Sequence, residues 1–196
     1  MNHLVTIAAE SVLAAGSAPD VSFVPPLVRR RFSLRQKLFF ALANAVADGE
    51  EREVVFASRD GEDALSRRIV EDFHVDGSVS PNRFSTSVYN AAPGLWSVFR
   101  RDRAAYTAIA AQDDTIECGL IEALGAARLP IFVYAEETGG GYGASARFAD
   151  GGAGRRVEVS DAAAGGAAVS FAALADFLSG RTSELNGRWL RLRAIG

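Results

Sequence analysis

Uninterrupted apolar runs, rather than alternating patterns, mark the strands of this chain. Residues 54–57 (Val-Val-Phe-Ala) and 130–135 are continuous apolar segments. Such segments are typical of strands that are buried on both faces of a sheet. Short apolar segments at residues 3–9 and 106–111 predict two further strands.

Helical periodicity separates these runs. Ser33 and Gln36 form a capping box ahead of apolar positions spaced by three or four residues, which predicts a helix over residues 34–47. Asp60 is placed to cap a second helix with apolar residues up to Phe73, and Asp113 or Asp114 to cap a third. The alternation of strands and helices predicts a right-handed parallel α/β sheet.

The pattern changes after residue 137. Strands at 143–149 and 155–159, joined by a glycine-rich turn, predict a hairpin. A helix near residues 170–179 follows. The last predicted strand, 188–194, is interpreted as an edge strand with its arginines in solvent.

Length and composition indicate one domain spanning residues 1–196. The chain has 196 residues, is 48% hydrophobic and carries a net charge of -3, so nothing in its charge favours nucleic acid. No apolar run reaches the roughly 18 residues of a membrane-spanning helix, and the N-terminal segment lacks the basic region of a cleaved signal. We therefore expect a cytoplasmic protein without a transmembrane segment.

Few side chains are available for catalysis. Cys118 is the only cysteine, and His3 and His74 are far apart in the sequence, so we expect no metal and no cofactor. Cys118 falls inside a predicted helix, where a buried structural cysteine is favoured over a reactive thiolate. The glycine-rich segment 139–143 lacks a P-loop lysine and is interpreted as a turn.

One segment of the sequence gives a more specific indication of the protein family. Residues 80–94 (Ser-Pro-Asn-Arg-Phe-Ser-Thr-Ser-Val-Tyr-Asn-Ala-Ala-Pro-Gly) resemble the segment that precedes the nucleophile in ketosynthases. Residues 26–31, 55–61 and 110–123, and the pair Glu136-Glu137 after an apolar strand, follow in the matching order. Through about residue 137 the chain therefore resembles the stand-alone family of β-ketoacyl synthase N-terminal-like proteins.

This resemblance implies one half of a thiolase-like fold. The expected fold class is α/β, with a mixed, mostly parallel five-stranded sheet and helices on both faces. A complete ketosynthase is twice this size and takes two catalytic histidines from its C-terminal half. Neither His3 nor His74 falls where those histidines would lie.

The resemblance also assigns a residue to the position of the nucleophile. In ketosynthases the acyl-accepting cysteine lies on a tight turn between strand and helix, where the helix dipole favours the thiolate. When residues 119–123 are aligned with the helix after that turn, Gln112 falls near the nucleophile position and Cys118 lies too far along the chain. An amide cannot form the acyl thioester, and a glutamine here is similar to chain-length factors, the ketosynthase-like partners that lack the cysteine.

Taken together, these features predict a non-catalytic accessory similar to a chain-length factor. It would pair with an active β-ketoacyl synthase in bacterial fatty-acid-like, polyketide or aryl-polyene biosynthesis and shape the acyl tunnel of that partner. The residues expected at the tunnel or interface are Phe84, Val88, Asn90, Trp96, Val98, Phe99, Asp114 and Thr115. The residues considered for docking an acyl carrier protein, with solubility or ion pairing as the other interpretation, are Arg100, Arg101 and Arg103.

Two alternatives stay open at this point. A minimal acyltransferase or thioesterase would use Cys118 or a serine as its nucleophile. A homodimeric structural protein would use the half-thiolase surface only to associate with itself.

Overall fold

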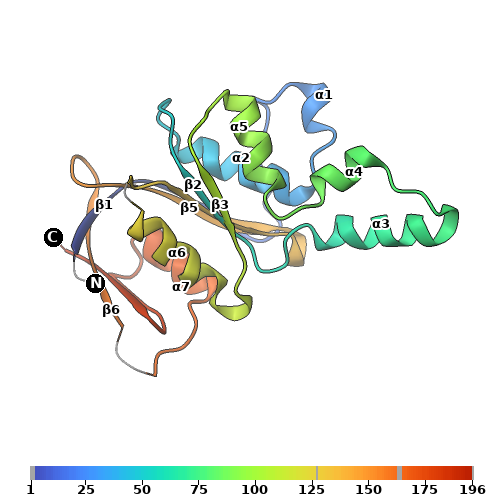
Figure 1. Ribbon diagram of the computed structural model, residues 1–196. Coiled ribbons are helices and arrows are strands. Elements are labelled where there is room, and N and C mark those ends of the chain that lie inside the picture. Colours follow the sequence, from blue (N-terminus) through green and yellow to red (C-terminus); the bar gives the residue numbers. More distant parts are fainter. Residues whose placement is uncertain (1–2, 127, 163–164, 196) are drawn as a thin grey trace.

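A single eight-stranded sheet runs through the protein, with strand order β3-β2-β4-β5-β1-β6-β8-β7. The computed structural model describes residues 3–126, 128–162 and 165–195. The strands are β1 (His3–Leu13), β2 (Val54–Ala57), β3 (Tyr106–Ile109), β4 (Ile131–Glu136), β5 (Tyr142–Ala149), β6 (Arg155–Asp161), β7 (Glu184–Asn186) and β8 (Leu190–Ala194). The α-helices are α1 (Pro26–Arg29), α2 (Leu34–Val46), α3 (Asp63–Asp76), α4 (Pro81–Thr86), α5 (Ala91–Arg100), α6 (Thr115–Gly125) and α7 (Phe171–Leu178). Helices α2 and α5 lie on one side of the sheet, and α6 and α7 on the other (Figure 1).

The apolar strands β2 and β4 are buried on both faces because alternate residues point into different cores. Val54 and Phe56 of β2 pack with α2 and α5, whereas Val55 and Ala57 pack with α6 and α7. The apolar side chains of β4 alternate between the same two cores, and all residues of the strand are buried. This two-sided burial explains why the sequence shows continuous apolar runs there.

Helix α2 begins at the capping box that the sequence predicts. The Ser33 hydroxyl accepts from the Gln36 amide at 3.0 Å, and the Gln36 side chain accepts from the Ser33 amide at 3.2 Å. The helix then buries Phe39 and Phe40, which contact Phe56 and Trp96 in edge-to-face geometry. This aromatic cluster is the centre of the core between α2, α5 and the sheet.

The sheet differs from the sequence prediction in size and direction. It has eight strands rather than five, and it is not mostly parallel, because only the β3-β2-β4 part is parallel. The chain after residue 149 supplies the additional strands β6, β7 and β8, which extend the sheet as antiparallel neighbours of β1 and of one another. Because β7 occupies the edge, β8 is an interior strand and the edge-strand prediction for residues 188–194 is wrong.

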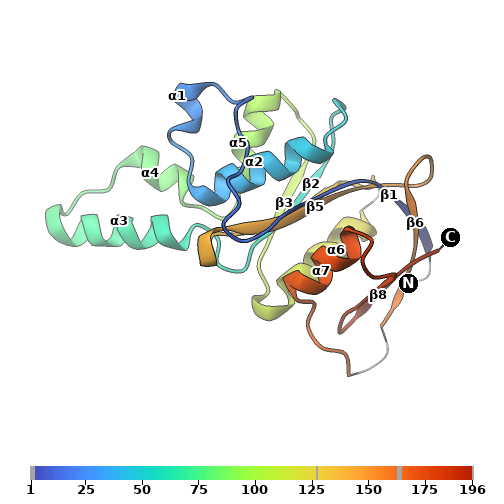
Figure 2. The same ribbon diagram turned by 180° about the vertical axis from the view of Figure 1, so that it is seen from behind.

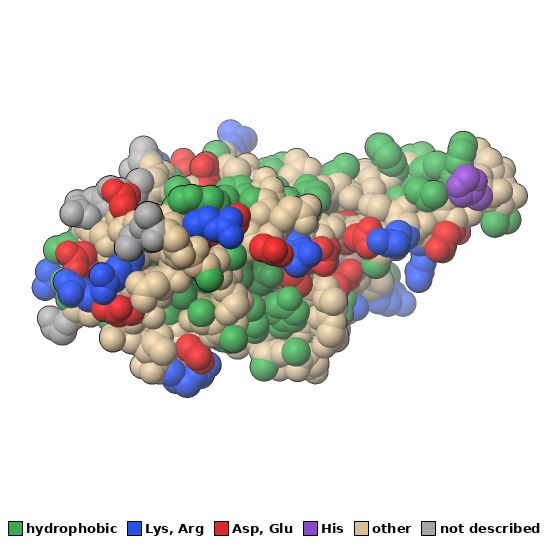
Figure 3. Space-filling view, turned by 90° about the horizontal axis from the view of Figure 1, so that it is seen from below, with side chains coloured by type: hydrophobic (Ala, Val, Ile, Leu, Met, Phe, Trp, Pro, Cys, Tyr) green, Lys and Arg blue, Asp and Glu red, His purple; other side chains and the backbone are tan. Residues whose placement is uncertain are grey.

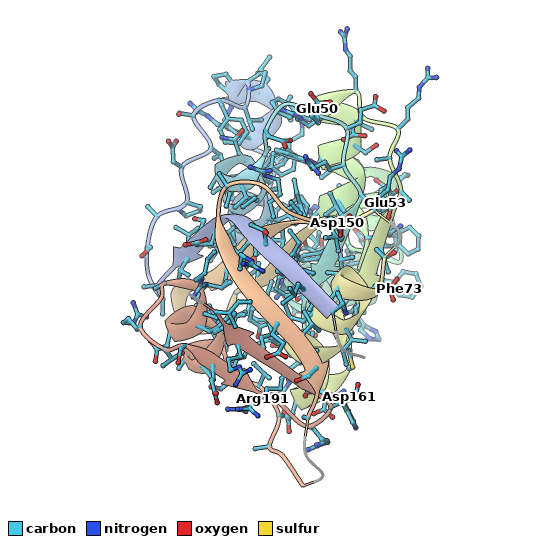
Figure 4. All side chains as sticks on the ribbon, turned by 90° about the vertical axis from the view of Figure 1, so that its left-hand side faces the viewer. Glu50, Glu53, Phe73, Asp150, Asp161 and Arg191 are labelled. Carbon is cyan, nitrogen blue, oxygen red and sulfur yellow. The ribbon has the colours of Figure 1, made fainter. Side chains whose placement is uncertain are left out.

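The predicted hairpin of β5 and β6 is also wrong, because β1 lies between them. Strand β1 pairs antiparallel with β5 on one side and with β6 on the other. The connecting loop, which contains Asp150 (Figure 4), crosses β1 at residues 6–8, in the middle part of that strand. It passes so closely that a Cβ atom on Gly154 would lie 2.3 Å from the Ile7 carbonyl oxygen. The glycine-rich turn predicts that the chain reverses direction after β5. It does not predict that β1 lies between β5 and β6.

Helices α3 and α4 form an arm that projects from the body of the protein (Figures 1 and 2). Neither helix has a buried residue, although α3 carries apolar side chains such as Phe73, which is 52% exposed. Asp60 does not cap α3 as predicted, because the helix starts later, with Glu62 at the N-cap position. The name arm is used below for residues 63–86.

The position of the core makes a direct prediction. We expect Phe39→Ala to lower the free energy of unfolding by about 3–5 kcal/mol, because Phe39 is fully buried and its removal leaves a cavity. The matched control is Phe73→Ala in the arm, which should change the free energy of unfolding by less than about 0.5 kcal/mol. Urea denaturation followed by circular dichroism measures both values. Equal losses in the two variants would contradict the assignment of the core.

Candidate functional site

Three parallel strands end at one edge of the sheet and bring polar residues together there. Ala57 at the end of β2 is level with Ile109 of β3 and with Tyr134 of β4. Ser58 and Arg59 follow β2, Gln112 follows β3 after a short turn, and β4 ends at Glu136. In α/β sheets, functional residues gather at this carboxyl edge. We therefore consider this edge as the candidate site.

Glu136 holds the centre of this edge together. Its carboxylate accepts from the Ser58 hydroxyl at 3.2 Å, from the Arg59 amide and from the Arg35 guanidinium at 3.5 Å. Glu136 and Arg35 are 2% and 1% exposed. Burial raises the pKa of Glu136, and the Arg59 amide and the Arg35 charge oppose that rise. Because these partners occupy its carboxylate, Glu136 acts as a structural lock between α2, β2 and β4.

Gln112 lies on the tight turn between β3 and α6. Its φ angle is 51°, a left-handed conformation that is rare for a residue other than glycine. The Thr115 hydroxyl stabilises the turn, since it donates to the Gln112 carbonyl at 2.7 Å and accepts from the Ala111 amide at 2.9 Å. The Gln112 side chain is exposed. A strained strand-to-helix turn with an exposed side chain is the geometry in which nucleophiles are presented in some α/β enzymes.

The surroundings of Gln112 are ionic, and its neighbouring carboxylates are engaged with arginines. Asp113 pairs with Arg59 at 3.0 Å, and Asp114 pairs with Arg188 at 2.8 Å, so neither side chain caps α6 as predicted. His3 lies in β1 and His74 near the end of α3. Among the described residues, no hydrogen bond or ion pair connects a histidine with this turn.

Cys118 is poorly placed to act as a nucleophile. It is the fourth residue of α6 and is partly buried. Burial raises the pKa of its thiol, and the nearby charges of Asp114 and Glu117 raise it further. The thiol form is therefore favoured, in agreement with a structural cysteine.

Glu117 has a structural role that the sequence analysis missed. It is fully buried, and its carboxylate accepts from the backbone amides of Arg188, Trp189 and Leu190 at 2.5–2.9 Å. Through these bonds it ties α6 to the segment before β8. No sequence motif indicates it, because its partners are backbone amides 71–73 residues away.

The residues predicted at a tunnel or interface fall into two groups. Phe84, Val88 and Val98 are surface residues, with exposures of 60%, 41% and 77%. Trp96 is only 3% exposed and belongs to the aromatic core, and Phe99 packs against the same core. Trp96 is therefore a core residue and Phe99 is a half-buried residue at the edge of the core, and their role at a tunnel or interface stays a prediction. Asn90 occupies the N-cap position of α5, Asp114 is ion-paired, and Thr115 is buried in the turn described above.

The three arginines considered for carrier-protein docking lie at the end of α5 and in the loop that follows it. The Arg100 guanidinium stacks over the Trp96 ring at 5.5 Å from the ring centre. Arg101 ends the helix in a left-handed conformation with φ 55°, and Arg103 is exposed in the loop before β3. Arg101 and Arg103 therefore present their charges to solvent.

A pocket of about 760 Å³ lies where the arm meets the body. Its walls include Leu27, Val28, Leu65 and Leu95, and the arginines Arg31, Arg68 and Arg83 also line it. The sequence analysis did not predict this pocket, because its walls come from five helices, α1 to α5, and from the loop after β4. Among the described residues, no group of three or more histidine, cysteine, aspartate or glutamate side chains is arranged to hold a metal ion.

Comparison with known proteins decides the family. Residues 6–129 match the family model described as "Beta-ketoacyl synthase, N-terminal domain". The chain belongs to this family. The β-ketoacyl synthase N-terminal resemblance noted in the sequence is thereby confirmed, and the thiolase-like α/β fold is confirmed with it, apart from the number and direction of the strands.

Solved structures include a chain of closely similar fold. It belongs to "Ketosynthase (ApeO) in Complex with its Chain Length Factor (ApeC)" from Xenorhabdus doucetiae, with a TM-score of 0.78 and 16% sequence identity. The match covers 98% of this β-ketoacyl synthase N-terminal chain and 100% of the other chain. The search of curated proteins gave no match. Within the described residues, no helix is long and apolar enough to cross a membrane.

A second buried carboxylate, Glu62, makes the stability of the fold depend on pH. Its carboxylate accepts from the Ser33 hydroxyl at 3.1 Å and from the Gln36 amide nitrogen at 3.3 Å, and it is only 4% exposed. Burial raises the pKa of Glu62, and these hydrogen bonds oppose the rise. The folded chain therefore binds a proton at Glu62 more tightly than the unfolded chain does.

The sign of the resulting pH dependence follows from this raised pKa. The contribution of Glu62 to stability is present below the ordinary glutamate pKa and is lost as the pH rises through the raised value. Glu62→Gln cannot ionise, so we expect its free energy of unfolding, relative to wild type, to increase from about pH 4 to about pH 8. Urea denaturation at several pH values measures the trend. Exposed Glu51→Gln is the control, and a relative stability of Glu62→Gln that is flat or falls over this range would contradict the prediction.

Proposed function

We propose that this protein is a non-catalytic ketosynthase-like accessory, similar to a chain-length factor, that pairs with an active β-ketoacyl synthase. The observation that carries the proposal is Gln112 on the strained turn between β3 and α6. A carboxamide there cannot form an acyl thioester, and no histidine among the described residues contacts the turn. The turn between β3 and α6 thus has the geometry that presents a nucleophile, but the residue on it, Gln112, is not a nucleophile.

The structural neighbour supports a role beside a ketosynthase. A chain of the ketosynthase–chain length factor complex is covered in full by this chain. A role in bacterial fatty-acid-like, polyketide or aryl-polyene biosynthesis, in the cytoplasm, is the setting that we propose for it.

The surface for pairing is proposed along β3 and the neighbouring helices. Strand β3 is at the edge of the sheet and, among the described residues, pairs with β2 alone, so its other side offers backbone groups to a partner. Val98 of α5 and Phe84 of α4 are exposed apolar residues, and Tyr106 of β3 is partly exposed. Apolar side chains also gather on the projecting arm (Figure 3). Burial of this surface is the driving force that we propose for association.

The proposed mechanism is steric. Apolar side chains that the pairing surface presents to the partner, such as Phe84 and Val88, would close the acyl tunnel of the partner and limit chain length. Arg101 and Arg103, which face solvent, are proposed as a site for the acidic surface of an acyl carrier protein. These roles need no chemistry from this chain.

An independent acyltransferase or thioesterase is less well supported. Cys118 has a raised thiol pKa, and the Ser58 hydroxyl is buried and donates to Glu136. Both groups lack a histidine partner among the described residues. The homodimeric alternative uses the same exposed surface and is decided by the pairing experiment below.

The pairing surface gives the first functional test. We expect co-expression with a β-ketoacyl synthase from the same organism to give a complex that elutes as one species from size-exclusion chromatography. Val98→Glu should weaken this complex by at least about tenfold, because it places a charge within the apolar surface. Leu4→Glu, at an exposed apolar position of β1, is the matched control and should leave the complex intact. A chain that forms only homodimers would contradict the accessory function.

The absence of a nucleophile gives a second test. We expect no acyl adduct by mass spectrometry when the purified chain is incubated with an acyl thioester, at Cys118 or elsewhere. In the complex, Phe84→Ala should lengthen the product chains by making room in the tunnel, while Leu4→Ala should not. An adduct on the wild-type chain that disappears in Cys118→Ala would instead establish an enzyme.

A further inference from the structure

The arm is attached to the body at a narrow base. Its two helices bury none of their residues, so the core does not hold the arm in one direction. Within the arm, Arg83 of α4 forms an ion pair with Asp72 of α3, which ties the two helices to each other. The direction of the arm therefore depends on contacts at its base.

One buried side chain reaches both ends of this base. The Gln36 amide nitrogen donates to the Glu62 carboxylate at 3.3 Å, at the start of α3, and to the Thr86 carbonyl at 3.2 Å, at the end of α4. Its amide oxygen accepts from the Ser33 amide in the capping box of α2. Gln36 is 1% exposed, so these bonds lie away from water. Both N–H groups and the oxygen of this one amide are therefore used to join α2, α3 and α4.

A second contact secures the same base. The Tyr89 hydroxyl donates to the Arg59 carbonyl at 2.5 Å, and the Tyr89 ring covers Gly61, where a Cβ atom would lie 2.4 Å from the ring. These residues lie just outside the arm, so they hold the connecting segments rather than the helix ends. Loss of the Gln36 bonds should therefore loosen the arm without detaching it.

We propose that Gln36 is a positioning residue that fixes the direction of the arm, and that this direction is required for pairing with the ketosynthase partner. The second half of the proposal rests on the proposed function. A polar anchor suits this task because its hydrogen bonds are directional, whereas an apolar contact would allow the arm several orientations. The buried amide thus links the start of the core helix α2 to the surface that a partner meets.

The test measures the arm directly. Spin labels at Val75→Cys in the arm and Glu50→Cys in the turn between α2 and β2, in a Cys118→Ser background, report the distance distribution by pulsed electron resonance. Both positions are exposed, and Glu50 is labelled in Figure 4. We expect a narrow distribution in the parent chain and a broad one in Gln36→Met, which keeps the length of the side chain but removes the amide. Glu62→Gln retains an acceptor for Gln36 and should stay narrow.

A matched control separates positioning from loss of stability. Ser170→Ala removes the cap of α7, where the Ser170 hydroxyl accepts from the Ala173 amide, far along the chain from the arm. It should lower stability by an amount similar to that caused by loss of the α2 cap, yet leave the distance distribution narrow. If Gln36→Met does not fold, Glu62→Leu removes the acceptor and leaves the α2 capping box intact, and it should give the same broadening.

Pairing affinity completes the test. We expect Gln36→Met to weaken the complex with the ketosynthase by about tenfold or more, and Ser170→Ala to leave it unchanged. A narrow distribution in Gln36→Met, or a broad one with unchanged affinity, would overturn the inference. Failure of the parent chain to pair at all would overturn the proposed function and the pairing half of this inference, whereas the distance distributions decide the anchoring half independently.

Discussion

Burial of β2 and β4 on both faces is the constraint from which the rest of the structure follows. Because α2 and α5 cover one face and α6 and α7 the other, β2 and β4 are apolar at every position up to Glu136, the last residue of β4, and their parallel pairing sets Ala57 level with Tyr134. The chain can become polar only where the strands stop. That requirement places Ser58, Gln112 and Glu136 at one edge of the sheet.

The same edge shows how the protein manages buried charge. Glu136 is paired with Arg35 and hydrogen-bonded to Ser58, and Glu62 is held by Ser33 and Gln36. Each of these carboxylates accepts hydrogen bonds from neighbouring side chains, whereas Oε2 of Glu62 and the Nε and Nη1 atoms of Arg35 are buried without a hydrogen-bond partner among the described residues. These polar groups fix the relative positions of α2, β2 and the start of the arm.

The arm combines a rigid base with an exposed surface. Apolar residues such as Val75 stay 88% exposed, while the base is fixed by buried hydrogen bonds. An isolated chain gains nothing from ordering such a surface, because no apolar area is removed from water. The arrangement is understandable if the area is buried on association, and it agrees with a protein that acts through a partner.

Local patterns predicted much of the fold. The capping box at Ser33 and Gln36, the apolar run of β4 and the α6 periodicity depend on neighbours a few residues apart, so the sequence alone predicts these elements. The resemblance in residues 80–94 led to the family, and Gln112 falls on the strand-to-helix turn where the alignment put it. The apolar spacing of residues up to Phe73 also predicted helix α3 correctly. The same spacing does not distinguish a helix packed on the core from one in an exposed arm.

Long-range placement was decided only by the tertiary structure. Glu117 binds amides more than 70 residues away, Trp96 is covered by the α2 aromatics, and β1 enters between β5 and β6. The sequence by itself determined which segments become helices and strands, because backbone preference and apolar spacing are local. Only the tertiary structure decided which of these segments contact one another. Burial and hydrogen bonding between distant residues depend on how the strands pair and on which helices cover each face of the sheet.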